Sequence, residues 1–162
     1  MVYQEVYKDI FTCSIDYKIV HCISADFKLG AGIAKRIADM FYMKEYLLKE
    51  YPDYLNRWSA HNDVDKADCL MVNVDTKEGY ILQLFNLVTK TRYYDKPTYG
   101  SITKALQCLK EQCSANNIKR IAMPQIGCGL DKLEWTKVSK IIKDIFESTD
   151  IEILICIHNP QT

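Results

Sequence analysis

The stretch Ile126-Gly127-Cys128-Gly129-Leu130-Asp131 places two glycines between the β-prone residues 121–123 and a segment with helical spacing of apolar residues. Leu29-Gly30-Ala31-Gly32-Ile33 repeats this arrangement between a predicted strand that ends at Cys22 and the next helix. Glycine at a strand-to-helix turn lets the backbone adopt positive φ and approach a ligand closely, and the amides of the helix start favour an anion. Two such loops at one edge of a sheet predict a cradle that holds a diphosphate from both sides.

Either glycine pair alone would indicate only a tight turn, because a single Gly-x-Gly is weak evidence for a ligand site. Four of the six glycines of the chain lie in these two loops, and this concentration favours the phosphate cradle. Neither loop is a Walker A motif, because no Gly-Lys-Ser or Gly-Lys-Thr follows the glycines. Gly30-Ala31-Gly32 also lacks the third glycine of the dinucleotide-binding fingerprint.

The rest of the chain alternates between apolar runs typical of strands and segments in which apolar residues recur at helical spacing. The predicted strands cover residues 2–6, 19–22, 69–74, 80–88, 121–123 and 151–157. The predicted helices cover residues 32–41, 43–50 and 101–115, with a further one around Trp135, Val138, Ile142 and Ile145, and residues 54–63 are expected to be irregular. The alternation of strands and helices in the second half indicates an α/β fold with parallel pairing, in which ligands bind at the carboxyl ends of the strands.

A length of 162 residues without a repeat, low-complexity tract or linker predicts one domain over residues 1–162. The composition, with 48% hydrophobic and 26% charged residues, is typical of a soluble globular protein. The 21 basic and 21 acidic residues give a net charge of zero. Neutrality argues against a general nucleic-acid binder, which neutralises phosphates with a basic face, but it is compatible with a small anionic ligand held by backbone amides.

No apolar run approaches the roughly 20 residues of a transmembrane helix, and the first residues lack the basic and apolar pattern of a signal peptide. We therefore expect a cytoplasmic protein that does not bind membranes. The seven cysteines include no C-x-x-C pair, and the three histidines show no metal-ligand spacing. We expect reduced thiols, no metal and no cofactor.

The motifs of the two glycine loops stand in a fixed order with several others along the chain. The segments are His21-Cys22-Ile23-Ser24, Gly30-Ala31-Gly32-Ile33-Ala34, Thr89-Lys90 with Lys96-Pro97-Thr98-Tyr99, and Met123-Pro124 with Ile126-Gly127-Cys128-Gly129-Leu130-Asp131 and Trp135. Together they resemble the macro domain family over nearly the whole chain. The branch they resemble contains terminal ADP-ribose protein glycohydrolase and related O-acyl-ADP-ribose deacylases.

The resemblance implies a three-layer α/β/α domain with a mixed, largely parallel central sheet and an ADP-ribose cleft at its edge. It places Asp9 at the adenine amino group, with Ile10 beside it, and Ser24 near the distal ribose. The diphosphate and the distal ribose would be held by the two glycine loops, at Gly30, Ala31, Gly32, Ile33, Ile126, Gly127, Cys128, Gly129 and Leu130.

The chain also departs from the family pattern. Ser24-Ala25-Asp26-Phe27-Lys28 stands where the better-known macro hydrolases carry an asparagine-rich segment, so their asparagine-based mechanism is not available here. This departure favours the glycohydrolase branch. Lys8 precedes Asp9 where a glycine is usual, and Gln125 replaces a basic residue of some relatives. These two changes bear on affinity at the adenine end and on substrate choice.

The resemblance further implies a chemical pair. The lysine that matches Lys90 attacks the anomeric carbon of the distal ribose, and the aspartate that matches Asp131 assists by accepting or donating a proton. An attacking amine must first lose its proton, for which an unperturbed lysine has a pKa of about 10.4; desolvation in a cleft favours this loss and a neighbouring carboxylate opposes it. Without the resemblance, Lys90 would be interpreted as a solvated strand-end lysine and Asp131 as a turn or helix-start residue.

Other residues with reactive or aromatic side chains have less specific signals. Cys128 is interpreted as a small residue that fills its loop, with a reactive thiol as the alternative. His21 is interpreted as a strand-end histidine satisfied by the backbone, with a general base as the alternative. Tyr93, Tyr94 and Tyr99 either stack on a ligand and gate the cleft or form a half-exposed aromatic surface.

The expected function is an ADP-ribosyl hydrolase that removes mono-ADP-ribose from Glu or Asp carboxylates, deacylates O-acyl-ADP-ribose, or does both. The alternatives are a non-catalytic ADP-ribose reader, an ADP-ribose 1″-phosphate phosphatase, and an enzyme that removes ADP-ribose from a nucleobase. Neutral charge weakens the modified-DNA alternative, although Lys8, Lys28, Arg92 and Lys96 could form a local basic patch. The expected partners are ADP-ribose and ADP-ribosylated substrates, and the expected oligomeric state is a monomer.

Overall fold

The computed structural model describes residues 1–60 and 65–158, which form a six-stranded sheet in the order β1-β6-β5-β2-β4-β3. The strands are β1 (Val2–Tyr7), β2 (Lys18–Ser24), β3 (Asp68–Asp75), β4 (Ile81–Lys90), β5 (Arg120–Met123) and β6 (Glu152–Ile157). The edge strand β3 pairs antiparallel with β4, and every other described pair is parallel. The mixed, largely parallel sheet predicted from the sequence is confirmed.

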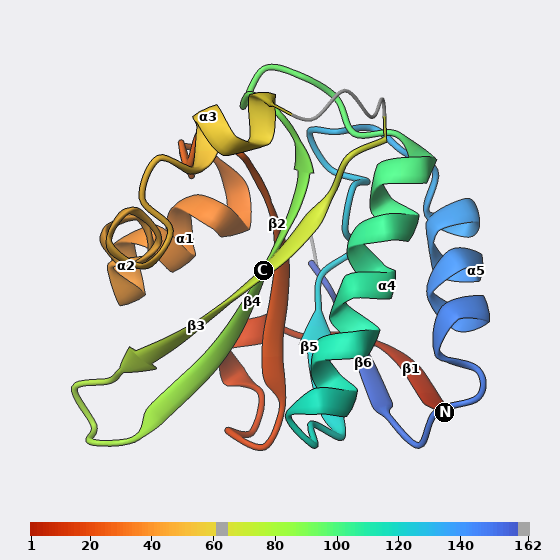
Figure 1. The fold of residues 1–162 in the computed structure, drawn as a ribbon. Helices are drawn as coiled ribbons and strands as arrows, with labels where there is room; N and C mark the ends of the chain where they lie inside the picture. The colour runs from red at the N-terminus through yellow and green to blue at the C-terminus, as the bar shows by residue number, and fades with distance from the viewer. Residues whose placement is uncertain (61–64, 159–162) are drawn as a thin grey trace.

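Helices cover both faces of this sheet (Figure 1). One face carries α1 (Gly32–Phe41), α2 (Met43–Glu50) and α3 (Tyr54–Ser59), and the other carries α4 (Tyr99–Ala115) and α5 (Trp135–Phe146). A short 3-10 helix, η1 (Ile10–Thr12), follows β1. Each space between helices and sheet holds its own cluster of buried hydrophobic side chains, which confirms the three-layer α/β/α architecture. Within residues 1–60 and 65–158, no helix combines the length and apolar character needed to cross a membrane.

The start of α4 shows how local sequence frames the edge of the sheet where the site lies. The Thr98 hydroxyl accepts a hydrogen bond from the Ser101 amide (2.9 Å), and Ser101 Oγ accepts one from the Thr98 amide (3.0 Å). This reciprocal capping box begins the helix at a defined residue. Ile102, Leu106 and Leu109 then lie on one buried face, and burial of each such side chain stabilises the fold by about 1.5–3 kcal/mol.

Residues 54–59 form helix α3, so the expectation of an irregular segment is wrong there, and residues 61–64 lie outside the described part of the chain. The helix has six residues, too few for helical periodicity to show in the sequence. Packing stabilises it instead, because Tyr54 and Trp58, one turn apart, are both buried in the core between the helices and the sheet.

The ends of three neighbouring strands bring the predicted motifs together. Strand β4 continues past residue 88 to Lys90, which pairs with Ser24 across a register shift at the end of β2. Because β5, β2 and β4 are adjacent and parallel, their carboxyl ends meet at one edge of the sheet. The loops that follow them, including both glycine pairs, therefore converge there.

Candidate functional site

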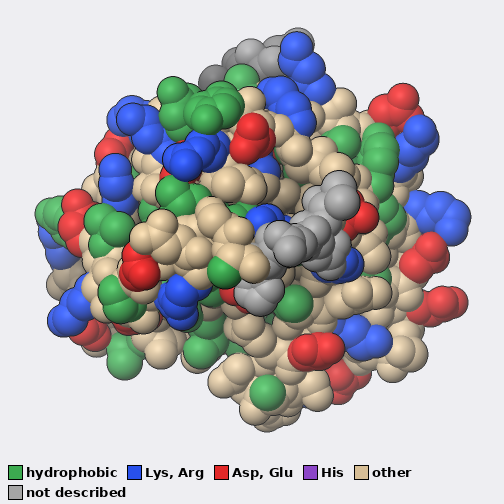
Figure 2. Space-filling model, turned by 45° about the horizontal axis from the view of Figure 1, so that its top comes forward, with side chains coloured by type: hydrophobic (Ala, Val, Ile, Leu, Met, Phe, Trp, Pro, Cys, Tyr) green, Lys and Arg blue, Asp and Glu red, His purple; other side chains and the backbone are tan. Residues whose placement is uncertain are grey.

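A cavity of about 560 Å³ opens between the loops that follow β2, β4 and β5. Of the predicted site residues, those that line it are Ser24, Gly30, Ala31, Gly32, Ile33, Lys90, Ile126, Gly127, Gly129, Leu130 and Asp131. The lining side chains include three lysines (Lys28, Lys90 and Lys96) and one aspartate, an excess of two positive charges at neutral pH. Figure 2, which turns the top of the Figure 1 view toward the reader, shows Lys and Arg side chains beside hydrophobic ones at this end. The cavity is therefore suited to an anion with an apolar part.

The first glycine loop is held in an unusual backbone conformation by two buried side chains. Phe27 (φ 53°) and Leu29 (φ 43°) are left-handed although neither is glycine, and both are nearly fully buried. Phe27 stacks on Tyr54 of α3, with ring centroids 5.2 Å apart. Since left-handed backbone is costly for such residues, packing must stabilise it. The result is a loop that leads into α1 at Gly32, where no side chain caps the helix N-terminus.

The second glycine loop has one position that requires glycine. Gly127 has φ 74°, and a Cβ placed there would lie 3.1 Å from the Cδ1 atom of Leu133. Gly129, in contrast, has no heavy atom within 4 Å of a Cβ placed on it and no positive φ. The Gly127 carbonyl accepts a hydrogen bond from the Leu133 amide (2.8 Å), which closes the loop in front of α5.

Replacement of Gly127 by alanine is expected to lower the free energy of unfolding by about 1–2 kcal/mol, since it adds left-handed strain and a tight contact with Leu133. Gly129→Ala is the matched control and is expected to change it by less than about 0.5 kcal/mol. Urea denaturation of both variants measures the difference. Equal stability of the two proteins would contradict this explanation of the loop.

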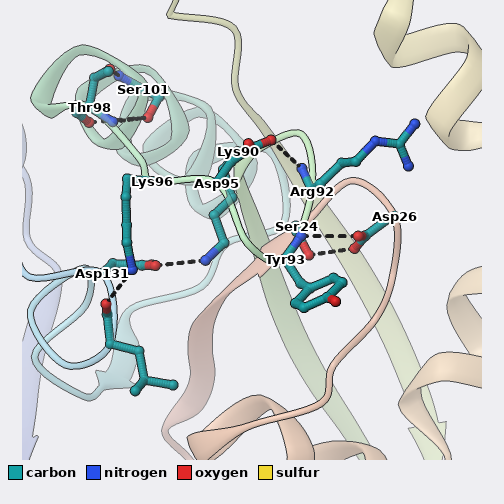
Figure 3. A network of polar contacts seen from close by, with 11 residues as sticks. Ser24, Asp26, Lys90, Arg92, Tyr93, Asp95, Lys96, Thr98, Ser101 and Asp131 are labelled. Carbon is teal, nitrogen blue, oxygen red and sulfur yellow. Dashed lines mark hydrogen bonds and ion pairs between the residues drawn. The ribbon is translucent and has the colours of Figure 1, made fainter.

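Lys90, the last residue of β4, and Asp131, in the loop before α5, meet in the lining of the cavity. Lys90 Nζ lies 2.6 Å from Asp131 Oδ1, and each side chain is only 14% exposed. Figure 3 shows that Lys96 approaches the same loop, where its Nζ donates to the carbonyl of Leu130 (2.7 Å). The guanidinium of Arg92 points away from the pair (Figure 3). A short contact between an amine and a carboxylate with little solvent can pass a proton from one to the other.

Asp26 joins the first glycine loop to the loop that follows Lys90. Its Oδ1 accepts from the Ser24 hydroxyl (2.6 Å) and the Lys28 amide (3.1 Å), and its Oδ2 accepts from the Tyr93 amide (3.0 Å; Figure 3). The Lys28 ammonium also lies 5.6 Å from the ring centroid of Tyr93. One carboxylate therefore sets the position of the first glycine loop relative to the Lys90 loop.

Replacement of Asp26 by alanine is expected to lower the free energy of unfolding by about 1–3 kcal/mol, because it leaves two loop amides without their charged acceptor. It should also weaken ADP-ribose binding, since the two loops lose their link. Asp39→Ala, which removes an exposed pair with Lys35, is the control and is expected to cost less than about 0.5 kcal/mol. Calorimetry of both variants tests this, and identical losses would contradict a linking role for Asp26.

Three predicted ligand-binding residues are not among those that line the cavity. Ile10 is 3% exposed and packs in the core. Asp9 begins η1 and pairs with Arg36 (3.1 Å), whose hydrogen bond lowers the pKa of the Asp9 carboxyl. Cys128 turns its thiol toward the Ile126 carbonyl (3.3 Å), and burial raises its pKa to about 11. The Cys128 thiol is therefore neutral and weakly reactive near pH 7.

His21 lines the cavity but is not satisfied by the backbone as predicted. Its Nε2 bonds to Asn86 Oδ1, while the Asn86 amide nitrogen donates to the Leu70 carbonyl (3.1 Å). Asn86 Oδ1 can only accept, so Nε2 of His21 carries the proton and Nδ1 does not. Burial lowers the pKa of His21 to about 4, and the side chain is neutral at physiological pH.

Several residues of the cavity had only weak sequence signals. Tyr93 lines it, whereas Tyr94 does not, and the Tyr99 hydroxyl instead accepts from the Glu134 amide (3.1 Å). In the sequence, Lys28 and Lys96 belong to a local basic patch, and Lys96 also belongs to the motif Lys96-Pro97-Thr98-Tyr99, but neither is predicted to line the site. An aspartate side chain often accepts a hydrogen bond from the backbone amide two residues later, so the bond from the Lys28 amide to Asp26 has a local sequence signal. The bond from the Tyr93 amide to Asp26 has none, because the two residues are far apart in the chain. Over the described ranges, no three His, Cys, Asp or Glu side chains are grouped so as to hold a metal ion.

Comparison with known proteins agrees with this geometry. The sequence matches the family model described as Macro domain over residues 20–142. A Bos taurus protein named ADP-ribose glycohydrolase OARD1 is 38% identical over 147 residues, which cover 91% of this chain and 86% of that protein.

Two solved structures support the fold. The macrodomain of Mycobacterium tuberculosis DarG has a TM-score of 0.76 at 18% identity, with 98% of each chain covered. Thermosipho africanus DarTG, solved in complex with ADP-ribose, has a TM-score of 0.75 at 17% identity, with 99% of this chain and 42% of that one covered. The sequence match extends over most of the chain. The sheet and its two helical layers superpose on these macrodomain structures. This protein belongs to the macro domain family.

Proposed function

We propose that this protein is an ADP-ribosyl hydrolase that releases ADP-ribose from carboxylate-linked acceptors, deacylates O-acyl-ADP-ribose, or does both. The observation that carries the proposal is the 2.6 Å contact between Lys90 and Asp131 inside a positively charged cavity. A relative at 38% identity is named an ADP-ribose glycohydrolase, which supports the same reaction class. In this proposal, Lys90 is the nucleophile and Asp131 accepts its proton.

The cavity offers groups for the diphosphate and the distal ribose of ADP-ribose. Backbone amides of Gly32 and Ile33, at the uncapped N-terminus of α1, are suited to the diphosphate. The loop at Gly127 and Gly129 faces them across the cavity and allows close approach of the backbone. This orientation of the ligand brings the distal ribose to Lys90.

The proposed reaction has two steps. The Lys90 amine passes a proton to Asp131 and attacks the anomeric carbon, while the bond from that carbon to the acceptor oxygen breaks and its electron pair leaves with the carboxylate. Water then attacks the same carbon as the bond to Lys90 breaks, and the proton of the water goes to the departing amine. ADP-ribose leaves, Asp131 gives its proton to solvent, and the starting pair of ammonium and carboxylate is restored. The short contact between Lys90 Nζ and Asp131 Oδ1 supports the first step, because it joins the proposed nucleophile to the proposed proton acceptor.

The first test follows free ADP-ribose released from a glutamate-modified protein, together with calorimetric binding of ADP-ribose. Turnover with saturable binding is the expected result. Binding without turnover on this substrate and on O-acetyl-ADP-ribose would contradict the proposal and favour a reader, in which the contact between Lys90 and Asp131 has only a structural role.

A further inference from the structure

Two cysteine thiols from distant parts of the sequence are in contact. Cys13 Sγ lies 3.5 Å from Cys156 Sγ, although the two residues are 143 positions apart. Within residues 1–60 and 65–158, no other pair of thiols is in hydrogen-bond contact. The two sulfurs of a disulfide are about 2.0 Å apart, so those of Cys13 and Cys156 need to approach by about 1.5 Å to form one.

The two sulfurs are held by different kinds of backbone. Cys156 belongs to β6 and pairs with Val6 of β1, so its position in the sheet is fixed. Cys13 directly follows η1, with extended backbone (φ −67°, ψ 151°) and an amide that donates to the Ile10 carbonyl (3.3 Å). Because Cys13 belongs to no strand, it can move toward Cys156 without breaking a strand pair.

The exposure of the two thiols differs as well. Cys13 is half-buried, whereas Cys156 is only 4% exposed, and burial raises the pKa of its thiol to about 12. A dissolved oxidant therefore reaches the Cys13 sulfur first, while Cys156 remains a protected thiol beside it. An accessible cysteine next to a second one that can react with its oxidised form is the arrangement of a reversible redox site.

We propose that Cys13 and Cys156 form a reversible disulfide in the presence of a peroxide. The Cys13 sulfur attacks one peroxide oxygen and loses its proton, the O–O bond breaks, and a sulfenic acid and one water form. The Cys156 sulfur then attacks the Cys13 sulfur, the S–O bond breaks, and the Cys156 proton leaves with the hydroxyl as a second water. Two thiols are thereby oxidised and one peroxide is reduced, and a dithiol reverses the change by thiol–disulfide exchange.

This disulfide joins η1 to β6. Asp9, the first residue before η1, pairs with Arg36 of α1 (3.1 Å), whose guanidinium lies 4.5 Å from the ring centroid of Phe11. The cross-link therefore also secures the contact between η1 and α1. It closes a very long loop, which restricts the unfolded chain strongly and stabilises the fold. Neither cysteine lines the cavity of Lys90 and Asp131, so the redox site is separate from the proposed hydrolase chemistry.

The experiment treats the reduced protein with a small molar excess of hydrogen peroxide, removes the excess with catalase and maps its peptides by mass spectrometry. The protein is expected to lose the mass of two hydrogen atoms, with one cross-linked peptide pair that joins Cys13 to Cys156. Its melting temperature should rise by at least about 5 °C, because the cross-link lowers the entropy of the unfolded state. Dithiothreitol should reverse both changes.

Cys13→Ser should show neither the cross-link nor the rise in melting temperature. Cys108→Ser is the matched control and should behave as wild type, because Cys108 is half-buried on α4 and contacts no other thiol. Cys13 oxidised without a cross-link, a cross-link to another cysteine, or a cross-linked protein that melts no higher than the reduced one would overturn the proposal. The peptide map of the wild type gives this answer even if Cys13→Ser fails to fold.

Discussion

Replacement of Lys90 by alanine is expected to lower the rate of ADP-ribose release by at least about 10³-fold, while the affinity for ADP-ribose changes by less than about tenfold. The reason is that Lys90 supplies the proposed nucleophile, whereas the glycine loops supply the main contacts with the diphosphate. Single-turnover release from a glutamate-modified protein measures the rate, and calorimetry measures the affinity. The thermal stability of the variant must be measured as well, because the substitution leaves the largely buried Asp131 carboxylate without its cation.

Lys90→Arg separates nucleophilic from purely electrostatic catalysis. Arginine keeps a positive charge beside Asp131, but its guanidinium stays protonated and cannot attack the sugar. We expect this variant to be as inactive as Lys90→Ala and closer to wild type in stability. Lys140→Ala, which removes an exposed lysine that pairs with Asp144 and does not line the cavity, is the control and should leave kcat unchanged. Substantial activity in Lys90→Arg would contradict the nucleophile.

Replacement of Asp131 by asparagine is expected to reduce the rate by about 10²–10⁴-fold, the usual contribution of a general acid or base. Asparagine keeps an acceptor oxygen for the contact with Lys90 but cannot take the amine proton. ADP-ribose affinity should therefore remain close to that of wild type. Single-turnover kinetics measure the loss.

The control for Asp131→Asn is Asp144→Asn on α5, which alters an exposed pair with Lys140. It should have no effect on turnover, because exposed pairs contribute little and Asp144 does not line the cavity. Full activity in Asp131→Asn would show that the carboxylate serves only to hold Lys90 in place. That outcome would leave the proton transfer to water or substrate.

Local patterns account for what could be predicted about the fold. Periods of two and 3.6 residues reflect which side chains face a core, so they identified each strand and the four longer helices. The capping box at Thr98 and Ser101 is likewise a local device. Helix α3 escaped prediction because six residues carry no clear period, and its stability comes from the burial of Tyr54 and Trp58 against distant parts of the chain.

The sequence by itself determined the α/β class and the two glycine loops, because positive φ and strand-to-helix turns are local properties of the backbone. The proposed pair of Lys90 and Asp131 was predicted from the resemblance to a family and not from a local pattern. The tertiary structure alone decided which side chains meet. The sheet order brings β5, β2 and β4 side by side, so that Lys90 reaches Asp131 and Asp26 reaches Tyr93. Asp9, which follows the edge strand β1, pairs with Arg36 of α1 and is not among the residues that line the cavity. Contacts between residues far apart in the chain depend on how packed layers are arranged, and no local pattern encodes that arrangement.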